Sequence, residues 1–109
     1  MQTYSLIFYT RKTKFNADIL AIYFRITVNG KRKEISTGKT IKTKEWNSKA
    51  GKVNGNSVNS KSLNIFLESI RTKIFESYTL LFNNGKIITC ENLKNEFLGG
   101  KERKMTLID

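Results

Sequence analysis

Apolar and polar residues alternate along residues 19–38, which is the pattern of a β-hairpin with one buried face. Asn29 and Gly30 divide this stretch. An Asn-Gly pair between two strand-like runs is the strongest short-range hairpin signal, because a type I′ turn needs positive φ at both central residues. The turn also fixes the register. The predicted cross-strand pairs are Val28–Lys31, Thr27–Arg32, Ile26–Lys33, Arg25–Glu34, Phe24–Ile35 and Tyr23–Ser36.

The two faces of this hairpin differ in chemistry, because successive side chains of a strand point to opposite sides. One face carries the apolar residues Ile22, Phe24, Ile26, Val28 and Ile35. The other face carries Tyr23, Arg25, Thr27, Arg32, Glu34 and Ser36. The first face needs something to pack on, and the second is suited to water or to a polar partner.

A further strand is predicted over residues 4–10, which are rich in aromatic and β-branched side chains. Leu6 and Phe8 would join the core face and Ile7 and Tyr9 the opposite face, although the reverse phase is also compatible with the pattern. With the hairpin, this strand makes a three-stranded antiparallel sheet. Three strands are about the minimum for stability once another element covers the apolar face.

A long helix is predicted over residues 59–82, where apolar residues recur at steps of three and four. The stripe consists of Leu63, Phe66, Leu67, Ile70, Ile74, Tyr78 and Leu81, widened by Phe75 and Phe82. Asn59 or Ser60 is the expected N-cap, and residues 83–85 (Asn-Asn-Gly) are the expected stop. We expect this helix to cover the apolar face of the sheet.

The remaining segments are shorter. Residues 39–58 are polar and predict an ordered loop with a tight turn at residues 50–51, in which Trp46 lies over the sheet edge rather than serving as a platform for a ligand. Thr89 can cap a second helix over residues 90–98. The predicted fold is therefore α+β, a three-stranded antiparallel sheet packed on one long helix, with a short C-terminal helix.

The predicted division of the chain has three parts: a main domain over residues 1–85, a short helical extension over 86–100, and a linker over 101–109 toward a further domain. The 109-residue length suits one domain of this size.

Charge is concentrated in the front of the chain. The formal net charge is +11, with thirteen Lys and Arg against three acidic residues up to Ser62 and seven against six afterwards. This asymmetry favours a polyanionic partner, with nucleic acid ahead of an anionic membrane. Lysines that serve only solubility are the alternative explanation.

The chain lacks the residue types that most often serve as a general base or as zinc ligands in enzymes. The chain contains no histidine and one cysteine, Cys90, so the commonest general base and the usual zinc ligand sets are excluded. Cys90 in the first turn of a helix could have a lowered pKa, but a small buried thiol is the simpler interpretation. We therefore expect no enzymatic activity, no cofactor, no metal and no small-molecule substrate for this chain.

The lone cysteine also fits a reducing compartment. No signal pattern is present, and no apolar run approaches the roughly 20 residues that span a bilayer. We expect a soluble cytoplasmic protein without a membrane partner.

The polar face of the hairpin is the predicted site of nucleic-acid contact. Arg25 and Arg32 could reach guanine edges or phosphates in the major groove, which admits a two-stranded ribbon. The predicted DNA-binding residues are Tyr23, Arg25, Thr27, Lys31, Arg32, Lys33, Ser36, Arg11, Lys12 and Lys14. An alternative role for Arg25 is a surface ion pair with Glu34, and both roles are compatible. Tyr23 could instead belong to a second small core.

The order of these segments resembles a known family. Residues 22–38 (IYFRITVNGKRKEISTG), a KxxEWN segment at 42–47, the SKAGKV turn at 48–53, a long helix and ITCENLKNEFLG at 88–99 are similar to the N-terminal part of Bacteroides-type tyrosine recombinases, the integrases of phages and conjugative transposons. In that family the segment is an arm-type DNA-binding domain whose sheet enters the major groove of arm sites. The resemblance implies a DNA-facing role for Tyr23, Arg25, Thr27, Arg32 and Ser36, and other integrase protomers as partners. The family's catalytic residues have no counterpart in this chain.

Two other functions remain open from the sequence. A small basic RNA-binding or ribosome-associated protein would have a similar composition and fold class. A protein-interaction domain with incidental charge is the third possibility. Single-stranded nucleic acid would need exposed aromatic side chains for stacking, whereas duplex DNA depends more on the face with arginine and threonine.

Overall fold

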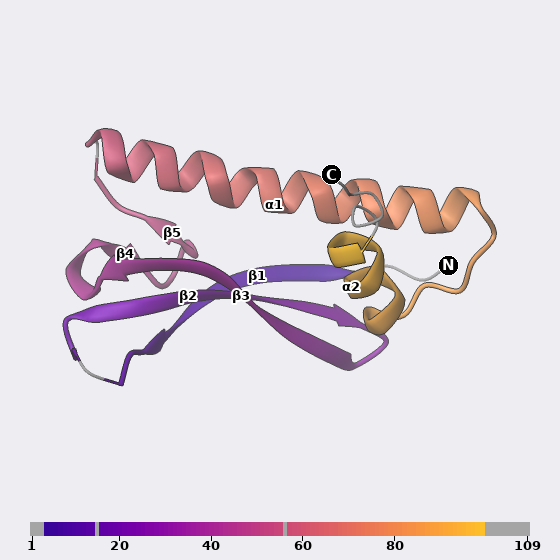
Figure 1. Cartoon of the computed structure of the whole chain (residues 1–109), viewed down its shortest axis with the longest axis horizontal. Helices are drawn as coiled ribbons and strands as arrows, with labels where there is room; N and C mark the ends of the chain where they lie inside the picture. Colours follow the sequence, from indigo (N-terminus) through magenta and orange to yellow (C-terminus); the bar gives the residue numbers. More distant parts are fainter. Residues whose placement is uncertain (1–3, 15, 56, 100–109) are drawn as a thin grey trace.

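A three-stranded antiparallel sheet lies beneath a long helix in this computed structural model, which describes residues 4–14, 16–55 and 57–99 (Figure 1). The strands and helices are β1 (Ser5–Lys12), β2 (Ile19–Val28), β3 (Lys31–Lys42), the 3₁₀ turn η1 (Thr43–Glu45), β4 (Trp46–Asn47), β5 (Lys52–Val53), α1 (Val58–Asn83) and α2 (Cys90–Gly99). The sheet order is β1-β2-β3, so β2 is the central strand, and β4 and β5 form a separate two-stranded ribbon. The α+β prediction is confirmed.

The β2–β3 hairpin has the predicted turn and register. Asn29 has φ 53° and Gly30 has φ 80°, as a type I′ turn requires. All six predicted cross-strand pairs occur, from Val28–Lys31 to Tyr23–Ser36. β1 pairs with the other edge of β2, with Phe8 opposite Phe24. Of the two phases that the pattern allowed, the one with Phe8 on the core face is present.

Strand β3 is longer than predicted. The pattern predicted a loop from Lys39 onward, but β3 continues to Lys42 after an irregularity in the pairing with β2 between Ala21 and Tyr23. Gly38 supplies a φ of +79° beside it, a conformation that costs glycine little. The Thr37 hydroxyl donates to the Ile22 carbonyl at 2.7 Å and so pairs a backbone oxygen at the irregularity.

The segment between β3 and α1 is held against the helix. The predicted turn at residues 50–51 is present, where Gly51 N donates to Asn47 O at 2.8 Å. The Asn64 side chain of α1 imitates a neighbouring strand, because its amide pairs with both Val53 N and Val53 O at 3.0 Å. Trp46 is half-buried and packs against the core.

The core lies between the sheet and the two helices. Its most deeply buried large side chains are Phe24, Ile22, Ile26, Ile74 and Leu93. They come from β2, α1 and α2, so the apolar face of the hairpin has the partner that its pattern required. α2 belongs to the same packing, since the Phe97 ring meets the edge of Phe24 with centroids 5.6 Å apart.

Helix α1 begins one residue earlier than predicted. Its N-cap is Ser57, whose hydroxyl accepts a hydrogen bond from Ser60 N at 3.1 Å, so the expectation of Asn59 or Ser60 as the cap was wrong. Both of those residues lie inside the first turn, and the Ser60 side chain is buried against Ser57. The predicted stop is confirmed, because α1 ends at Asn83 and Gly85 has φ 71°.

The predicted widening of the buried stripe by Phe75 and Phe82 was wrong. These rings are 58% and 51% exposed, and Phe82 stacks on the half-buried Tyr78 with centroids 6.3 Å apart. Three strands span only about 10 Å between the outer backbones, which is about the width of one helix. The sheet therefore covers one stripe of α1 and leaves its flanks in solvent.

Helix α2 spans Cys90–Gly99 and begins with the predicted cap, since the Thr89 hydroxyl accepts from Asn92 N at 2.9 Å. Cys90 is a free, buried thiol, as the simpler interpretation expected. Within the described part of the chain, no helix has the length and apolarity to cross a membrane. The predicted linker over 101–109 lies outside the described residues, and the division of the chain at residues 85 and 100 stays a prediction.

Candidate nucleic-acid interface

One face of the three-stranded sheet carries no covering element among the described residues, because α1 and α2 both lie on the other side (Figure 1). We call this the open face. It consists of Ile7, Tyr9 and Arg11 from β1, Tyr23, Arg25 and Thr27 from β2, and Arg32, Glu34 and Ser36 from β3. These positions alternate with the buried residues of the same strands, so the open face follows directly from the pattern of the core.

Glu34 links two arginines of the open face. Arg25 donates from Nε and Nη2 to Glu34 Oε2 at 3.3 and 3.0 Å. Arg11 donates to the other carboxylate oxygen, Oε1. The three side chains come from three different strands, so this cluster spans the sheet. It leaves both guanidinium groups with further N–H donors, since each arginine has five.

The rings of two tyrosines contact the guanidinium groups of the same two arginines. Tyr9 and Tyr23 are cross-strand neighbours with ring centroids 5.9 Å apart. The Arg11 guanidinium lies 4.6 Å from the Tyr23 centroid, and that of Arg25 lies 4.9 Å from the Tyr9 centroid. In cation–π contacts of this kind the guanidinium is attracted to the face of the ring, which restricts the position of the arginine side chain. Tyr23 is therefore part of the open face and not of a second core.

The Tyr9 hydroxyl lies beneath this cluster. Its oxygen is buried and has no hydrogen-bond partner of acceptable geometry among the described residues, although it is close enough to Glu34 to help lower the pKa of that carboxyl.

The Glu34 carboxyl provides a test of this cluster by pH titration. Hydrogen bonding from Arg25 is the largest cause that holds its pKa below the ordinary 4.5, with smaller contributions from Tyr9 and Arg11. We expect an NMR titration of the carboxyl carbon to have a midpoint below 4.5, and the Arg25→Ala variant to move it upward. A depressed pKa stabilises the fold above the unfolded-state value, and this contribution disappears as the pH falls through the folded-state value. Equal midpoints in both proteins would show that Arg25 does not hold the carboxylate in solution.

Arg32 differs from the other two arginines. It is exposed and makes no ion pair with any described residue. Thr27, its cross-strand neighbour, is half-buried. Ser36 is exposed, and its hydroxyl accepts from Gly38 N at 3.1 Å. The open face therefore combines two arginines that are paired with Glu34 and one that is exposed and makes no ion pair with a described residue.

The predicted lysines do not join this cluster. Lys33 is the cross-strand partner of the buried Ile26 and lies on the helix side of the sheet, where its Nζ is 3.5 Å from a carboxylate oxygen of Glu91 in α2. Lys12 is opposite Leu20, which packs on the core. Lys31 lies beside the turn, opposite the buried Val28, and Lys14 lies in the connection between β1 and β2. DNA contact by these four lysines stays a prediction.

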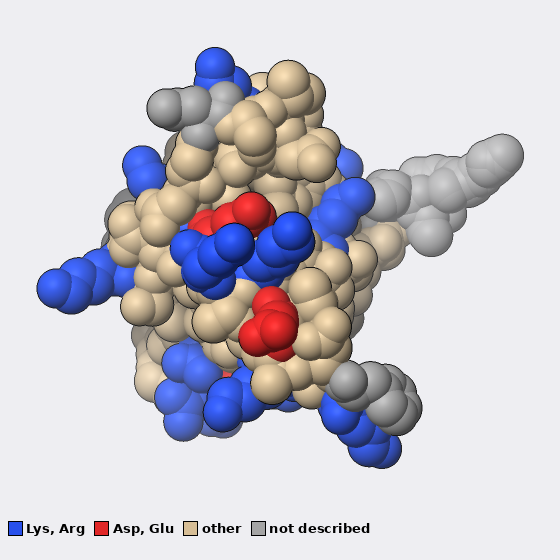
Figure 2. All heavy atoms as spheres, turned by 90° about the vertical axis from the view of Figure 1, so that its left-hand side faces the viewer, with Lys and Arg blue, Asp and Glu red and all other residues tan. Residues whose placement is uncertain are grey.

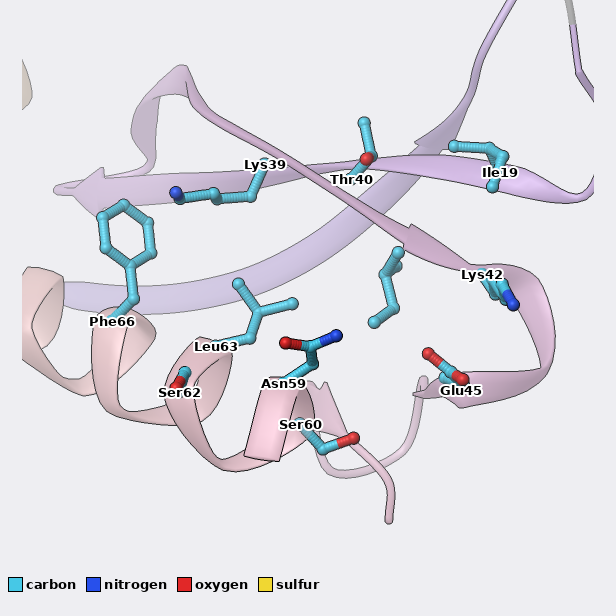
Figure 3. Close-up of a pocket in the computed structure, with 11 residues that line it drawn as sticks. Ile19, Lys39, Thr40, Lys42, Glu45, Asn59, Ser60, Ser62, Leu63 and Phe66 are labelled. Atoms are coloured by element: carbon cyan, nitrogen blue, oxygen red, sulfur yellow. The ribbon is translucent and has the colours of Figure 1, made fainter. Parts of the chain in front are cut away.

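Positive charge is present at other places on the molecule. Figure 2 shows Lys and Arg side chains pointing in several directions from the end of the molecule on the left of Figure 1, with acidic groups among them. A groove of about 440 Å³ lies between β3 and the first turns of α1 (Figure 3). Lys39 stands on one side of it, with Nζ 5.0 Å from the Phe66 ring centroid, and Leu63 on the other. The groove is on the helix side of the sheet, so it is separate from the open face.

No group of three or more His, Cys, Asp or Glu side chains that could hold a metal ion occurs among the described residues. The chemistry that the open face offers is hydrogen-bond donation and positive charge. That combination suits phosphates and base edges.

A family model for the arm DNA-binding domain matches residues 8–94. The chain belongs to the arm DNA-binding domain family. No curated protein and no solved structure matches it. The matched range includes most of β1 and all of β2, β3 and α1. This arm DNA-binding domain therefore has DNA as its partner, a role typical of tyrosine integrases, and such a domain is not catalytic by itself.

Sequence reasoning placed Arg11 and Tyr9 only in part. It named Arg11 as a DNA-binding residue but left it outside the predicted strand, whereas β1 continues to Lys12 and places Arg11 beside Tyr23. It put Tyr9 on the face opposite the core but gave it no role in DNA binding. The signal that could have placed Arg11 is the alternation of β1 extended by one more pair of residues, to positions 11 and 12.

Proposed function

We propose that this arm DNA-binding domain is the DNA-binding module of a site-specific tyrosine recombinase and that its open face enters the major groove of arm-type sites. The observation that supports this most is the uncovered sheet face with Arg11, Arg25 and Arg32 on three adjacent strands. Two strand spacings amount to about 10 Å, which is compatible with a major groove about 12 Å wide. The parent recombinase would supply catalysis and bring other protomers together in the cytoplasm.

The arginines would have different roles in this complex. Arg25 is held by Glu34 and by the Tyr9 ring, so it would meet DNA in one orientation, as bidentate readout of guanine requires. Arg32 lacks such support and would adapt to a base edge or a phosphate. Arg11 at the rim would contact the backbone. Thr27 and Ser36 would donate to phosphates or base acceptors.

The four predicted lysines would extend the backbone contacts. Lys31 and Lys33 lie near the hairpin turn and Lys12 and Lys14 at the opposite end of the sheet. Each phosphate that is neutralised increases the salt dependence of binding by about 0.9 in the log–log slope for B-DNA. These lysines would therefore contribute affinity and not sequence preference.

A competition titration tests the proposal against the RNA-binding alternative. The full chain is bound to a labelled duplex DNA at fixed salt and displaced with unlabelled duplex DNA or with a structured RNA of equal length. We expect the DNA to compete better, because the two tyrosines of the open face are covered by arginines and offer little surface for stacking. Better competition by the RNA would reject the proposal in favour of an RNA partner, and no binding of either would favour a protein-interaction domain.

A further inference from the structure

Ile7 is an apolar side chain in an otherwise polar surface. It is 47% exposed and lies on the open face. The other exposed large apolar side chains of the described residues lie in α1, in α2 or in the segment between them. Ile7 is therefore the one such residue of the sheet in the part of the chain that the structure describes.

Ile7 is the third residue of β1 and lies at the same level of the sheet as two charged residues of the open face. Its cross-strand partner is Arg25, which in turn is opposite Glu34 on β3. Arg25 is drawn toward Glu34 and the Tyr9 ring, and Ile7 remains accessible beside it. The nearest neighbours of Ile7 on the same side of β1 are Tyr9 and the exposed Ser5. These described neighbours of Ile7 all carry polar groups, so a protein partner would find little apolar area to bury there.

We infer that Ile7 packs against the C5-methyl group of a thymine and so determines part of the sequence preference, an inference that rests on the proposed major-groove contact. The thymine methyl is the apolar group that base pairs present in the major groove, and it is absent from the minor-groove edges. A branched alkyl side chain can make no hydrogen bond to a phosphate or base, so its contribution in this groove is apolar contact.

The register restricts where this thymine lies. Adjacent strands are about 4.8 Å apart, whereas successive base pairs are about 3.4 Å apart. Ile7 and Arg25 are on adjacent strands at the same level of the sheet. The thymine would therefore lie within about two base pairs of the group that Arg25 contacts.

Deoxyuridine substitution tests the inference, because it removes only the methyl group and keeps every hydrogen-bonding group of thymine. The full chain is used to select duplexes from a randomised pool, and each thymine of the selected duplex is then replaced singly by deoxyuridine. We expect one replacement to weaken binding about fourfold, the equivalent of one buried methyl-sized group. The Ile7→Ala variant should bind the thymine and deoxyuridine duplexes equally and keep the salt dependence of the parent protein.

Two controls make the result specific. Ile65→Ala removes an equally apolar side chain that is 70% exposed on α1, and this variant should keep the fourfold discrimination. Ile7→Val retains a branched side chain and should keep most of it; circular dichroism checks that each variant is folded. If the wild-type protein tolerates every deoxyuridine, or if Ile7→Ala remains sensitive to the same one, the inference about Ile7 is wrong while DNA binding stands. If no duplex is retained from the pool, the proposed function fails and the inference fails with it.

Discussion

Arg32→Ala is expected to weaken binding to duplex DNA by about 1–3 kcal/mol if the side chain reads a base. Arg32 is the suitable residue for this test because it is exposed and makes no ion pair with a described residue. Its removal therefore leaves no carboxylate of the described residues without its partner. The measurement is a titration of labelled duplex at several salt concentrations, on a preferred sequence and on an unrelated one.

The salt series separates two contributions of Arg32. Loss of a base contact would reduce binding to the preferred sequence and leave the unrelated duplex almost unaffected. Loss of a phosphate contact would weaken both duplexes and lower the salt slope by about one unit. Lys73→Ala on the outer side of α1 removes the same charge from an exposed position of the helix, and this control should leave the preferred-sequence affinity within about 0.5 kcal/mol. Equal losses in Arg32→Ala and Lys73→Ala would show that net charge, and not the open face, determines binding.

The contribution of Arg25 to DNA binding needs a different experiment, because Arg25 is paired with Glu34. Arg25→Ala leaves the Glu34 carboxylate with Arg11 as its remaining partner on the open face, so the variant adds a repulsive charge to the loss of a contact. The double variant Arg25→Ala/Glu34→Gln has the net charge of the parent protein. Together with the single Glu34→Gln variant, the two variants complete a double-mutant cycle that separates the contribution of Arg25 from that of the Glu34 carboxylate.

Phe24→Ala is expected to lower the free energy of unfolding by about 3–5 kcal/mol. Phe24 is 1% exposed and packs between the Phe8 and Phe97 rings, with centroid distances of 6.1 and 5.6 Å. It therefore joins β1, the central strand and α2. Such a loss is a large part of the 5–15 kcal/mol that stabilises a typical domain, and urea unfolding followed by circular dichroism measures it.

The matched control for this substitution is Phe75→Ala. Phe75 is the same residue type but 58% exposed on the flank of α1, and its removal should change the free energy of unfolding by less than about 0.5 kcal/mol. A large loss in Phe75→Ala would mean that the flank of α1 is covered in solution. A small loss in Phe24→Ala would contradict the packing of α2 on the sheet.

The sequence predicts the sheet well because the hairpin signals are local. Asn29-Gly30 fixes the turn, the turn fixes the register, and the alternation separates the core from the open face. For the first strand the alternation left two phases open, and the one with Phe8 in the core is present. The long helix is equally predictable from its apolar repeat, within one residue at each end.

Apart from the N-cap of α1, which is a local feature, the errors came from features that depend on partners distant in the sequence. The continuation of β3 past Gly38 depends on an irregularity opposite Ala21 and Tyr23, which no periodicity reveals. The exposure of Phe75 and Phe82 depends on the width of the sheet and not on the helix. The prediction of the candidate site was incomplete for the same reason. The pairing of Arg25 with Glu34 followed from the hairpin register, but the addition of Arg11 required β1 to be extended and correctly paired.

Lys33 lies where the predicted register placed it, opposite the buried Ile26. Its contact with DNA was predicted from its nearness to the turn and stays a prediction.

A chemical-shift map of the isotope-labelled chain with duplex DNA tests the central claim most directly. We expect the largest changes in the open face, at Ile7, Tyr23, Arg25, Thr27 and Arg32, with little change along the exposed side of α1. The largest changes at Lys73 and Glu76 of α1, with the open face unaffected, would contradict the claim that the uncovered face of the sheet is the surface that meets DNA.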